Sequence, residues 1–212
     1  MALIGWFGLS FFMQFHVGAI PETPDFRPVS PWQSMREPQP WLMQMLALPI
    51  GIAMAGVVGF LWLVLTPLRD TSWTLSIPGF LLSFVGIVVV HELIHAVVHP
   101  AAGLSPHSVL GVWPSRGLFY AAYTGELSRN RFIWILLMPL LVMSWLPLAV
   151  AAAGQMASGW AVYISTLNAL LACGDVLGAG MVWWQVPKSA TVRNQGWQTY
   201  WRDDSATVAS PA

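Results

Sequence analysis

Four long apolar stretches, separated by shorter polar ones, set the pattern of this chain. We expect them to form helices at about residues 42–65, 76–99, 132–153 and 160–186. Each stretch is longer than the roughly 20 residues that a helix needs to cross the hydrocarbon core of a bilayer. The pattern therefore predicts an all-α membrane protein with about four transmembrane helices, in a domain of residues 41–187.

The two ends of the chain differ from this domain. Residues 1–40 include a proline-rich polar segment, and residues 188–212 read as a polar tail. Residues 1–12 are apolar, but they lack the basic start of a signal peptide and are too short for a span. They fit either an extension upstream of a start at Met13 or a segment at the membrane interface.

The connection between the second and third helices, residues 100–130, has a pattern of its own. Apolar runs at 109–113 and 118–123 flank the turn-forming residues 114–117. This pattern fits a strand–turn–strand hairpin and equally an interfacial loop with aromatic anchors. A hairpin would have to lie against the helices or line a wet cavity, because bare strands are not stable in lipid.

The basic residues are distributed unevenly across the predicted topology. Four helices place both termini and the 100–130 connection on the same side. That side carries Arg27, Arg36, Arg116, Arg129, Arg131, Lys188, Arg193 and Arg202, whereas the other side carries Arg69 alone. Because Lys and Arg concentrate in cytoplasmic loops, we expect both termini to be cytoplasmic.

The composition agrees with a protein whose main partner is the lipid bilayer. Of 212 residues, 56% are hydrophobic and only 8% are charged, whereas soluble domains carry about 25% charged residues. The formal net charge of +0 gives no basic surface for nucleic acid. A single cysteine, Cys173, excludes a disulfide framework within the chain.

Ionisable residues inside the second helix carry the candidate chemistry. The sequence from His91 to His95 reads His-Glu-Leu-Ile-His. Two histidines four residues apart share one face of a helix and can bind one ion, and Glu92 is placed to take a proton from water at that ion. Such groups cost roughly 2.5 kcal/mol or more each in a membrane helix, which favours a metal site over a polar cluster that joins helices by hydrogen bonds.

A catalytic zinc ion normally has three protein ligands, so a third is needed. Asp175 is the other acidic residue within a predicted span, and it lies about as deep in the fourth helix as His91 lies in the second. His99 shares the face of the two histidines, but it stands about 12 Å along the axis from His91. We therefore expect Asp175 to be the ligand and His99 to lie near the membrane edge, close to the site.

Three further polar residues are candidates for a place in or near the site. Asn168 lies two turns before Asp175 on nearly the same face, where it fits a group that orients a ligand or contacts substrate and fits a helix–helix hydrogen bond equally well. His107 lies in the 100–130 connection, away from the predicted spans. Glu126 lies near Arg129 and fits a solvated charge.

These motifs in this order resemble site-2-protease-type intramembrane metallopeptidases. The chain is more similar still to a family of small bacterial membrane proteins described as putative zincin peptidases, to which residues 15–21 and 187–190 are also similar. The resemblance covers roughly residues 13–201. It implies that His91, His95 and Asp175 bind zinc, that Glu92 is the catalytic base, and that the protein lies in a bacterial inner membrane.

Together the motif and the resemblance predict a zinc metallopeptidase that cuts a peptide or membrane-protein substrate near the cytoplasmic leaflet. Two other functions fit the residues. One is a non-enzymatic membrane protein with a structural or sensing metal or polar cluster. The other is a zinc hydrolase of a non-peptide substrate, since the His-Glu-x-x-His chemistry does not choose among carbonyl compounds. The sequence specifies neither the substrate nor the oligomeric state.

Overall fold

The computed structural model describes residues 12–66, 76–154 and 157–205. Its helices are α1 (Pro40–Leu65), α2 (Ile77–Val98), α3 (Arg129–Leu140), α4 (Leu146–Gly154), α5 (Gly159–Leu171) and α6 (Cys173–Gln185). Among the described residues, three helical stretches are long and apolar enough to cross a membrane, or four if α5 and α6 form one bent span. The first eleven residues and the expected turn at Arg69 lie outside the described part.

Local signals explain where the helix that carries the His-Glu-x-x-His motif begins and ends. The Ser76 hydroxyl accepts a hydrogen bond from the Gly79 N–H, and Pro78 lies in the first turn. Both are common at helix starts, because serine satisfies a free N–H and proline has none to satisfy. At the other end, His99 caps the last turn and Pro100 begins the short 3₁₀ turn η1 (Pro100–Gly103).

The third predicted span is a single helical stretch with one irregular turn. The helices α3 and α4 are joined without a break by the π-helical turn η3 (Leu141–Trp145), and together they cover Arg129–Gly154. Pro139 lies inside α3 just before this turn. Proline removes a helical hydrogen bond, and π-turns occur mostly as single turns near functional sites.

The fourth span, predicted as one helix over 160–186, is two helices. Between α5 and α6, Ala172 has φ −70° and ψ 7°, and the two helix axes bend by 47°. The close approach of α1 to this break depends on Gly51. A Cβ atom at Gly51 would lie 2.6 Å from the Leu170 carbonyl oxygen and 2.9 Å from the Cys173 Cβ, so any larger residue would push α1 away from the break.

The prediction of an all-α membrane protein is confirmed only in part, because two small sheets accompany the helices. The first sheet has the order β1 (Gln14–Val17), β3 (Ser108–Trp113), β4 (Leu118–Tyr123), with β1 parallel and β4 antiparallel to β3. The second has the order β2 (Gln33–Ser34), β7 (Gln198–Asp203), β6 (Ala190–Gln195), β5 (Leu127–Ser128). The hairpin expected in the 100–130 connection is thus present, with the 3₁₀ turn η2 (Pro114–Arg116) at its tip.

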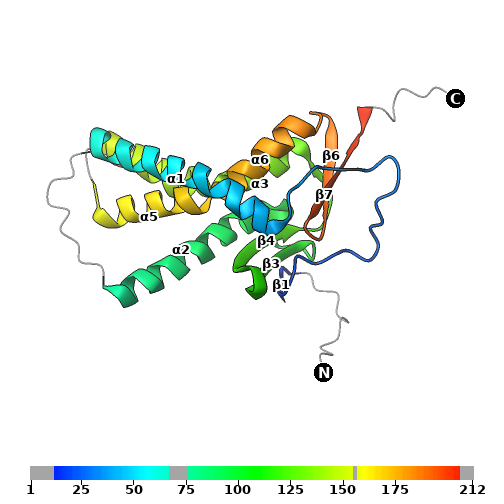
Figure 1. Ribbon diagram of the computed structural model, residues 1–212, viewed down its shortest axis with the longest axis horizontal. Coiled ribbons are helices and arrows are strands. Elements are labelled where there is room, and N and C mark those ends of the chain that lie inside the picture. Colours follow the sequence, from blue (N-terminus) through cyan, green and yellow to red (C-terminus); the bar gives the residue numbers. More distant parts are fainter. Residues whose placement is uncertain (1–11, 67–75, 155–156, 206–212) are drawn as a thin grey trace.

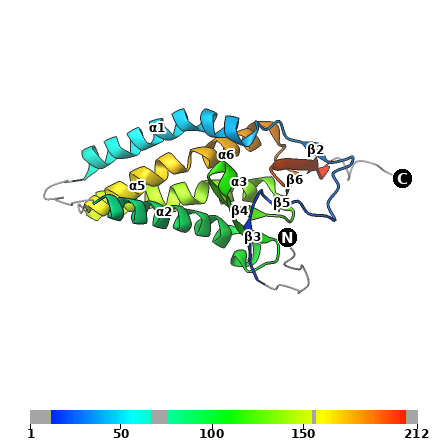
Figure 2. The ribbon, with the colours of Figure 1, turned by 60° about the horizontal axis from the view of Figure 1, so that its bottom comes forward.

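Both sheets lie at the same end of the helices (Figures 1 and 2). Residues 190–203, which the sequence suggested only as part of a polar tail, form the β6–β7 hairpin there. The segment before α1 is bound to this hairpin, since Glu37 accepts hydrogen bonds from the Thr199 N–H and hydroxyl and from Gln198 Nε2. The fold therefore joins segments from both ends of the chain into one polar cap over the helices.

Candidate metal centre

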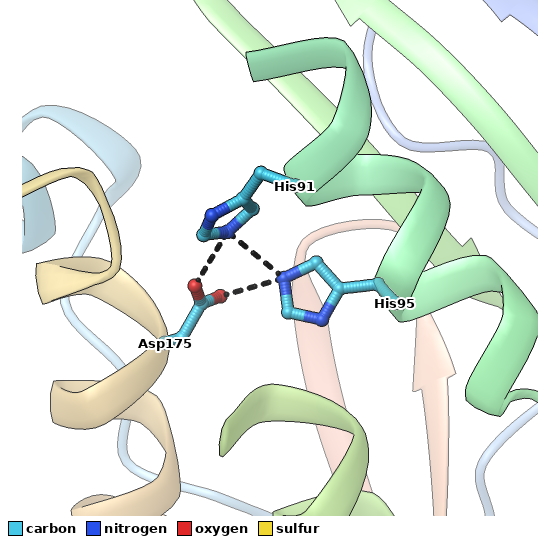
Figure 3. A group of neighbouring side chains, drawn as sticks. All are labelled: His91, His95 and Asp175. Carbon is cyan, nitrogen blue, oxygen red and sulfur yellow. Dashed lines mark hydrogen bonds and ion pairs between the residues drawn. The ribbon is translucent and has the colours of Figure 1, made fainter. Parts of the chain in front are cut away.

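Three side chains from two helices converge on one point (Figure 3). His91 and His95 come from α2, and Asp175 comes from the first turn of α6. His91 Nε2 lies 2.9 Å from Asp175 Oδ2 and 3.2 Å from His95 Nε2, and His95 Nε2 lies 3.3 Å from Asp175 Oδ1. The structure thus brings together the three residues that the sequence singled out as candidate ligands.

The break between α5 and α6 determines how Asp175 reaches the two histidines. It makes Asp175 a residue of the first turn of a new helix, three positions after the bend at Ala172. The sequence predicted that Asp175 lies near His91 because both residues would lie at similar depth along straight helices. The structure brings the two residues together as that argument expected, but through a bent helix pair instead of a straight span.

The outer nitrogens of both imidazoles are held by hydrogen-bond acceptors. His95 Nδ1 lies 2.8 Å from the Ile135 carbonyl oxygen of α3, which can only accept, so this nitrogen carries the hydrogen. His91 Nδ1 lies 2.8 Å from Asn168 Oδ1 of α5. Both Nε2 atoms of the neutral rings are therefore left with a lone pair, which is the form of histidine that binds metals.

The centre of the triangle consequently requires a cation. Two Nε2 lone pairs and two carboxylate oxygens face one another, and no donor hydrogen remains on the neutral rings to satisfy them. A metal ion or an extra proton on one imidazole would supply the positive charge. Tetrahedral zinc with bonds of about 2.0–2.1 Å places its ligand atoms about 3.3 Å apart, and the three distances here are 2.9, 3.2 and 3.3 Å. The residues present therefore fit zinc.

Asn168 links this centre to the third span. Its side chain is fully buried, and its Nδ2 donates to the Pro139 carbonyl at 3.0 Å and to Ser144 Oγ at 2.9 Å. These two acceptors fix the orientation of the amide, so that Oδ1 faces His91. The two roles expected for Asn168, orienting a ligand and joining helices, are therefore combined in one side chain.

Glu92 is not part of the triangle, although it lies near it and near the backbone of Ala121 in β4. It also lines a cavity of about 820 Å³, together with His95 and Asp175. An acid group that shares a cavity with two of the three candidate ligands, without being part of the cluster, is placed to act on a molecule bound there.

The same cavity extends along β4 to the polar cap. Its lining includes Glu37 and Thr199 of the polar cap as well as residues 117–123. Burial raises the pKa of the Glu37 carboxyl above its ordinary value, although hydrogen bonds from Thr199 lower it. The cavity therefore runs from the candidate ligands in the helices to an acidic group at the sheet end.

The remaining candidates lie outside the triangle. His99 is buried, with Nδ1 3.1 Å from Ser108 Oγ and its ring 5.3 Å from the ring of Tyr123, and it lines the cavity next to His95. His107 lies near the Thr124 hydroxyl. Glu126 forms an exposed ion pair with Arg202. Of the His, Cys, Asp and Glu side chains in the described residues, those that gather as a metal-binding group are His91, His95 and Asp175.

The sequence analysis did not identify two groups, one in α3 and one in η3, that help to hold the two histidines of α2. The Ile135 carbonyl and Ser144 are not ionisable, so a search for charged residues in the spans passes over them. A signal for the first did exist. Pro139 stands four residues after Ile135, and a proline at that position leaves the carbonyl without its helical partner.

Comparison with protein families agrees with this geometry. A family model described as "Putative zincin peptidase" matches residues 84–191, just over half of the chain. The chain belongs to this family. The matched segment begins within α2, contains the residues of the triangle together with Glu92 and Asn168, and ends in β6. Searches of curated proteins and of solved structures gave no match for this zincin-family chain.

Proposed function

We propose that this protein is a zinc-dependent metallopeptidase that hydrolyses a peptide bond within the membrane, near the cytoplasmic leaflet. The observation that carries the proposal is the triangle of His91, His95 and Asp175 beside a cavity that Glu92 also lines. Membership of a family described as zincin peptidases supports the same activity. The residues of the triangle would hold the zinc ion.

The position in the membrane rests on the distribution of charge and on the fold. Of the eight basic residues assigned to the cytoplasmic side, Arg129 and Arg131 lie in the first turn of α3. The others lie in the segments before α1 and after α6, in the β6–β7 hairpin, or in η2 at the tip of the β3–β4 hairpin. A polar cap rich in Arg is expected on the cytoplasmic side. Both termini and both sheets would then be cytoplasmic, and the triangle would lie near the cytoplasmic end of α2, beside the first turn of α6.

The side chains divide the chemistry between them. When bound, a zinc ion would polarise the scissile carbonyl as a Lewis acid and activate a water molecule for attack. Glu92 would accept a proton from that water and pass it to the leaving amine nitrogen. The backbone of Ala121, which lies near Glu92, would help to hold the carboxylate in the cavity that both residues line.

A peptide substrate is favoured by the strand that lines the cavity. In the described residues, β4 is an edge strand that pairs with β3 on one side, and its residues line the cavity. An extended peptide placed along this edge would form main-chain hydrogen bonds with β4. Hydrolysis requires an extended backbone, and such binding would hold one beside Glu92.

The arrangement argues against a closed structural metal site. Structural zinc sites normally have four protein ligands, whereas catalytic sites have three and leave one position for water or substrate. In the described part of the chain, three candidate ligands gather, and two of them border the cavity. An open position beside a cavity is the arrangement that catalysis needs.

The zinc content of the detergent-purified protein tests the proposal first. We expect about one zinc per chain in the wild type, loss of zinc in Asp175→Ala, and retention in His99→Ala, the matched control on the same face of α2. A wild type that stays metal-free after loading and washing would contradict the proposal.

Cleavage of a library of quenched fluorescent peptides by the zinc-loaded protein tests the enzymatic part. Glu92→Gln removes the base and keeps the shape of the side chain, so it should bind zinc as the wild type does and lose cleavage by a factor of about 100 or more. A Glu92→Gln protein that cleaves as fast as the wild type would refute the assigned role of Glu92.

A further inference from the structure

Pro139 is connected to the candidate metal centre through its backbone. In a regular α-helix, the carbonyl of Ile135 would accept a hydrogen bond from the N–H of residue 139. Proline has no N–H. The Ile135 carbonyl is thereby free of its helical partner, and it accepts the Nδ1–H of His95 at 2.8 Å.

The carbonyl of the same proline serves the other histidine. It accepts a hydrogen bond from Asn168 Nδ2 at 3.0 Å. This bond, with the one to Ser144 Oγ, turns Asn168 Oδ1 toward His91 Nδ1 at 2.8 Å. One residue of α3 therefore acts on both histidines, through the donor that it lacks and through the acceptor that it has.

We propose that Pro139 is a positioning residue of the metal site, one that keeps both imidazoles in the tautomer with a free Nε2. The inference rests on the proposed zinc site and extends it to a residue outside the three candidate ligands. Outer hydrogen bonds to metal-binding histidines set the ring orientation and tautomer, and losing one typically reduces metal affinity 10- to 100-fold.

The change Pro139→Ala distinguishes a positioning role from a purely structural one, because the two roles predict different zinc affinities for the variant. Alanine supplies an N–H that competes with His95 for the Ile135 carbonyl, and it removes a residue that disfavours helix. If Pro139 positions the ligands, zinc affinity should fall about 10- to 100-fold, while the thermal stability of the metal-free protein stays equal or rises. If Pro139 only shapes the helix, zinc affinity should stay unchanged.

The chain offers a matched control in Pro49, the interior proline of α1. Pro49→Ala makes the same chemical change in another long apolar helix, and it should leave zinc affinity unchanged. A second variant replaces residue 139 with lactic acid, the hydroxy-acid analogue of alanine. It has the side chain of alanine but again lacks the N–H, so it should restore most of the lost affinity.

The measurements are a competition titration of zinc against a chelating dye and a nuclear magnetic resonance spectrum of ¹⁵N-labelled histidine, both on the full chain in detergent. In the metal-free protein, at a pH high enough for both imidazoles to be neutral, Pro139→Ala should move His95 from the Nδ1–H form toward the Nε2–H form. An unchanged His95 tautomer in Pro139→Ala would overturn the inference, as would unchanged zinc affinity or a failure of the lactic-acid variant to restore it.

The spectrum also separates this inference from the proposed function. It needs no metal, so it tests the link between Pro139 and His95 even in a protein that binds no zinc. A wild type that binds no zinc, with a tautomer that still responds to Pro139→Ala, would refute the metal site and leave the link intact. Zinc binding in the wild type with no effect of Pro139→Ala on affinity or tautomer would support the metal site and refute the link between Pro139 and His95.

Discussion

Replacing Asn168 by alanine tests whether the outer hydrogen bonds hold the metal centre together. The wild-type side chain forms three hydrogen bonds, to His91 Nδ1 at 2.8 Å, to Ser144 Oγ at 2.9 Å and to the Pro139 carbonyl at 3.0 Å. The side chain is fully buried, so water cannot take over its hydrogen bonds unless it enters the cavity that the alanine leaves.

The expected magnitude follows from these three bonds. Each buried hydrogen bond contributes about 1 kcal/mol to the free energy of unfolding, and a buried donor left without an acceptor costs about 1–3 kcal/mol. We therefore expect Asn168→Ala to lower the free energy of unfolding by about 3 kcal/mol. The loss of the acceptor for His91 should also weaken zinc binding about 10- to 100-fold, which corresponds to about 1.4–2.7 kcal/mol.

A second substitution at the same position separates these two effects. Asn168→Asp keeps an oxygen facing His91 but loses the donor to Pro139 and Ser144. The Ser144 hydroxyl cannot reverse its role freely, because it already donates to the Ser165 carbonyl at 2.8 Å. Stability should therefore fall at least as far as in the alanine variant, while zinc affinity stays near the wild-type value or rises, since a carboxylate is a stronger acceptor.

The assay is thermal unfolding in detergent, followed by tryptophan fluorescence, together with a zinc competition titration at a temperature where every variant is folded. Val192→Ala is the control for stability alone. It removes fully buried methyl groups from the apolar cluster of Met35, Val182 and Val186, outside the hydrogen bonds that link Asn168 to the ligands. Equal zinc affinity in the wild type and in Asn168→Ala, or equal loss in the alanine and aspartate variants, would refute the assigned orientation of His91.

Two further predictions concern the break in the fourth span and the polar cap. Gly51→Ala should destabilise the protein by about 1–3 kcal/mol and weaken zinc binding, because the added Cβ would lie 2.6 Å from the Leu170 carbonyl oxygen and displace the bend that positions Asp175. The control is Gly56→Ala, where a Cβ would meet no atom within 4 Å. Equal zinc affinity in both variants would contradict the reasoning. Because burial raises the pKa of Glu37, its contribution to stability is fully present below the ordinary carboxyl pKa and is lost as the pH rises through the raised value. Unfolding measured between about pH 4 and pH 8 should therefore show a loss of stability that Glu37→Gln removes, and an unchanged pH profile in that variant would exclude Glu37 as its source.

Much of this molecule could be predicted from local features of the sequence. Helices α1 and α2 follow from runs of apolar residues, and the ends of α2 follow from Ser76 and Pro100. The candidate ligands stood out because ionisable groups are costly in a membrane helix, so that His91, His95 and Asp175 required an explanation. Each of these inferences depends on a few neighbouring residues or on a cost that every membrane helix shares.

The tertiary structure decided what depends on distant partners. The two sheets draw their strands from both ends of the chain, and a strand such as β1 or β7 has no local signal strong enough to predict its partner. The bend at Ala172 and the requirement for glycine at position 51 depend on how α1 packs against α5 and α6.

The hydrogen bond from His95 to the Ile135 carbonyl shows the division most clearly. The sequence determined that this carbonyl is free, because Pro139 has no N–H to offer it. Only the packing of α3 against α2 determined which group would use it, since a backbone acceptor takes whichever donor the fold brings within reach.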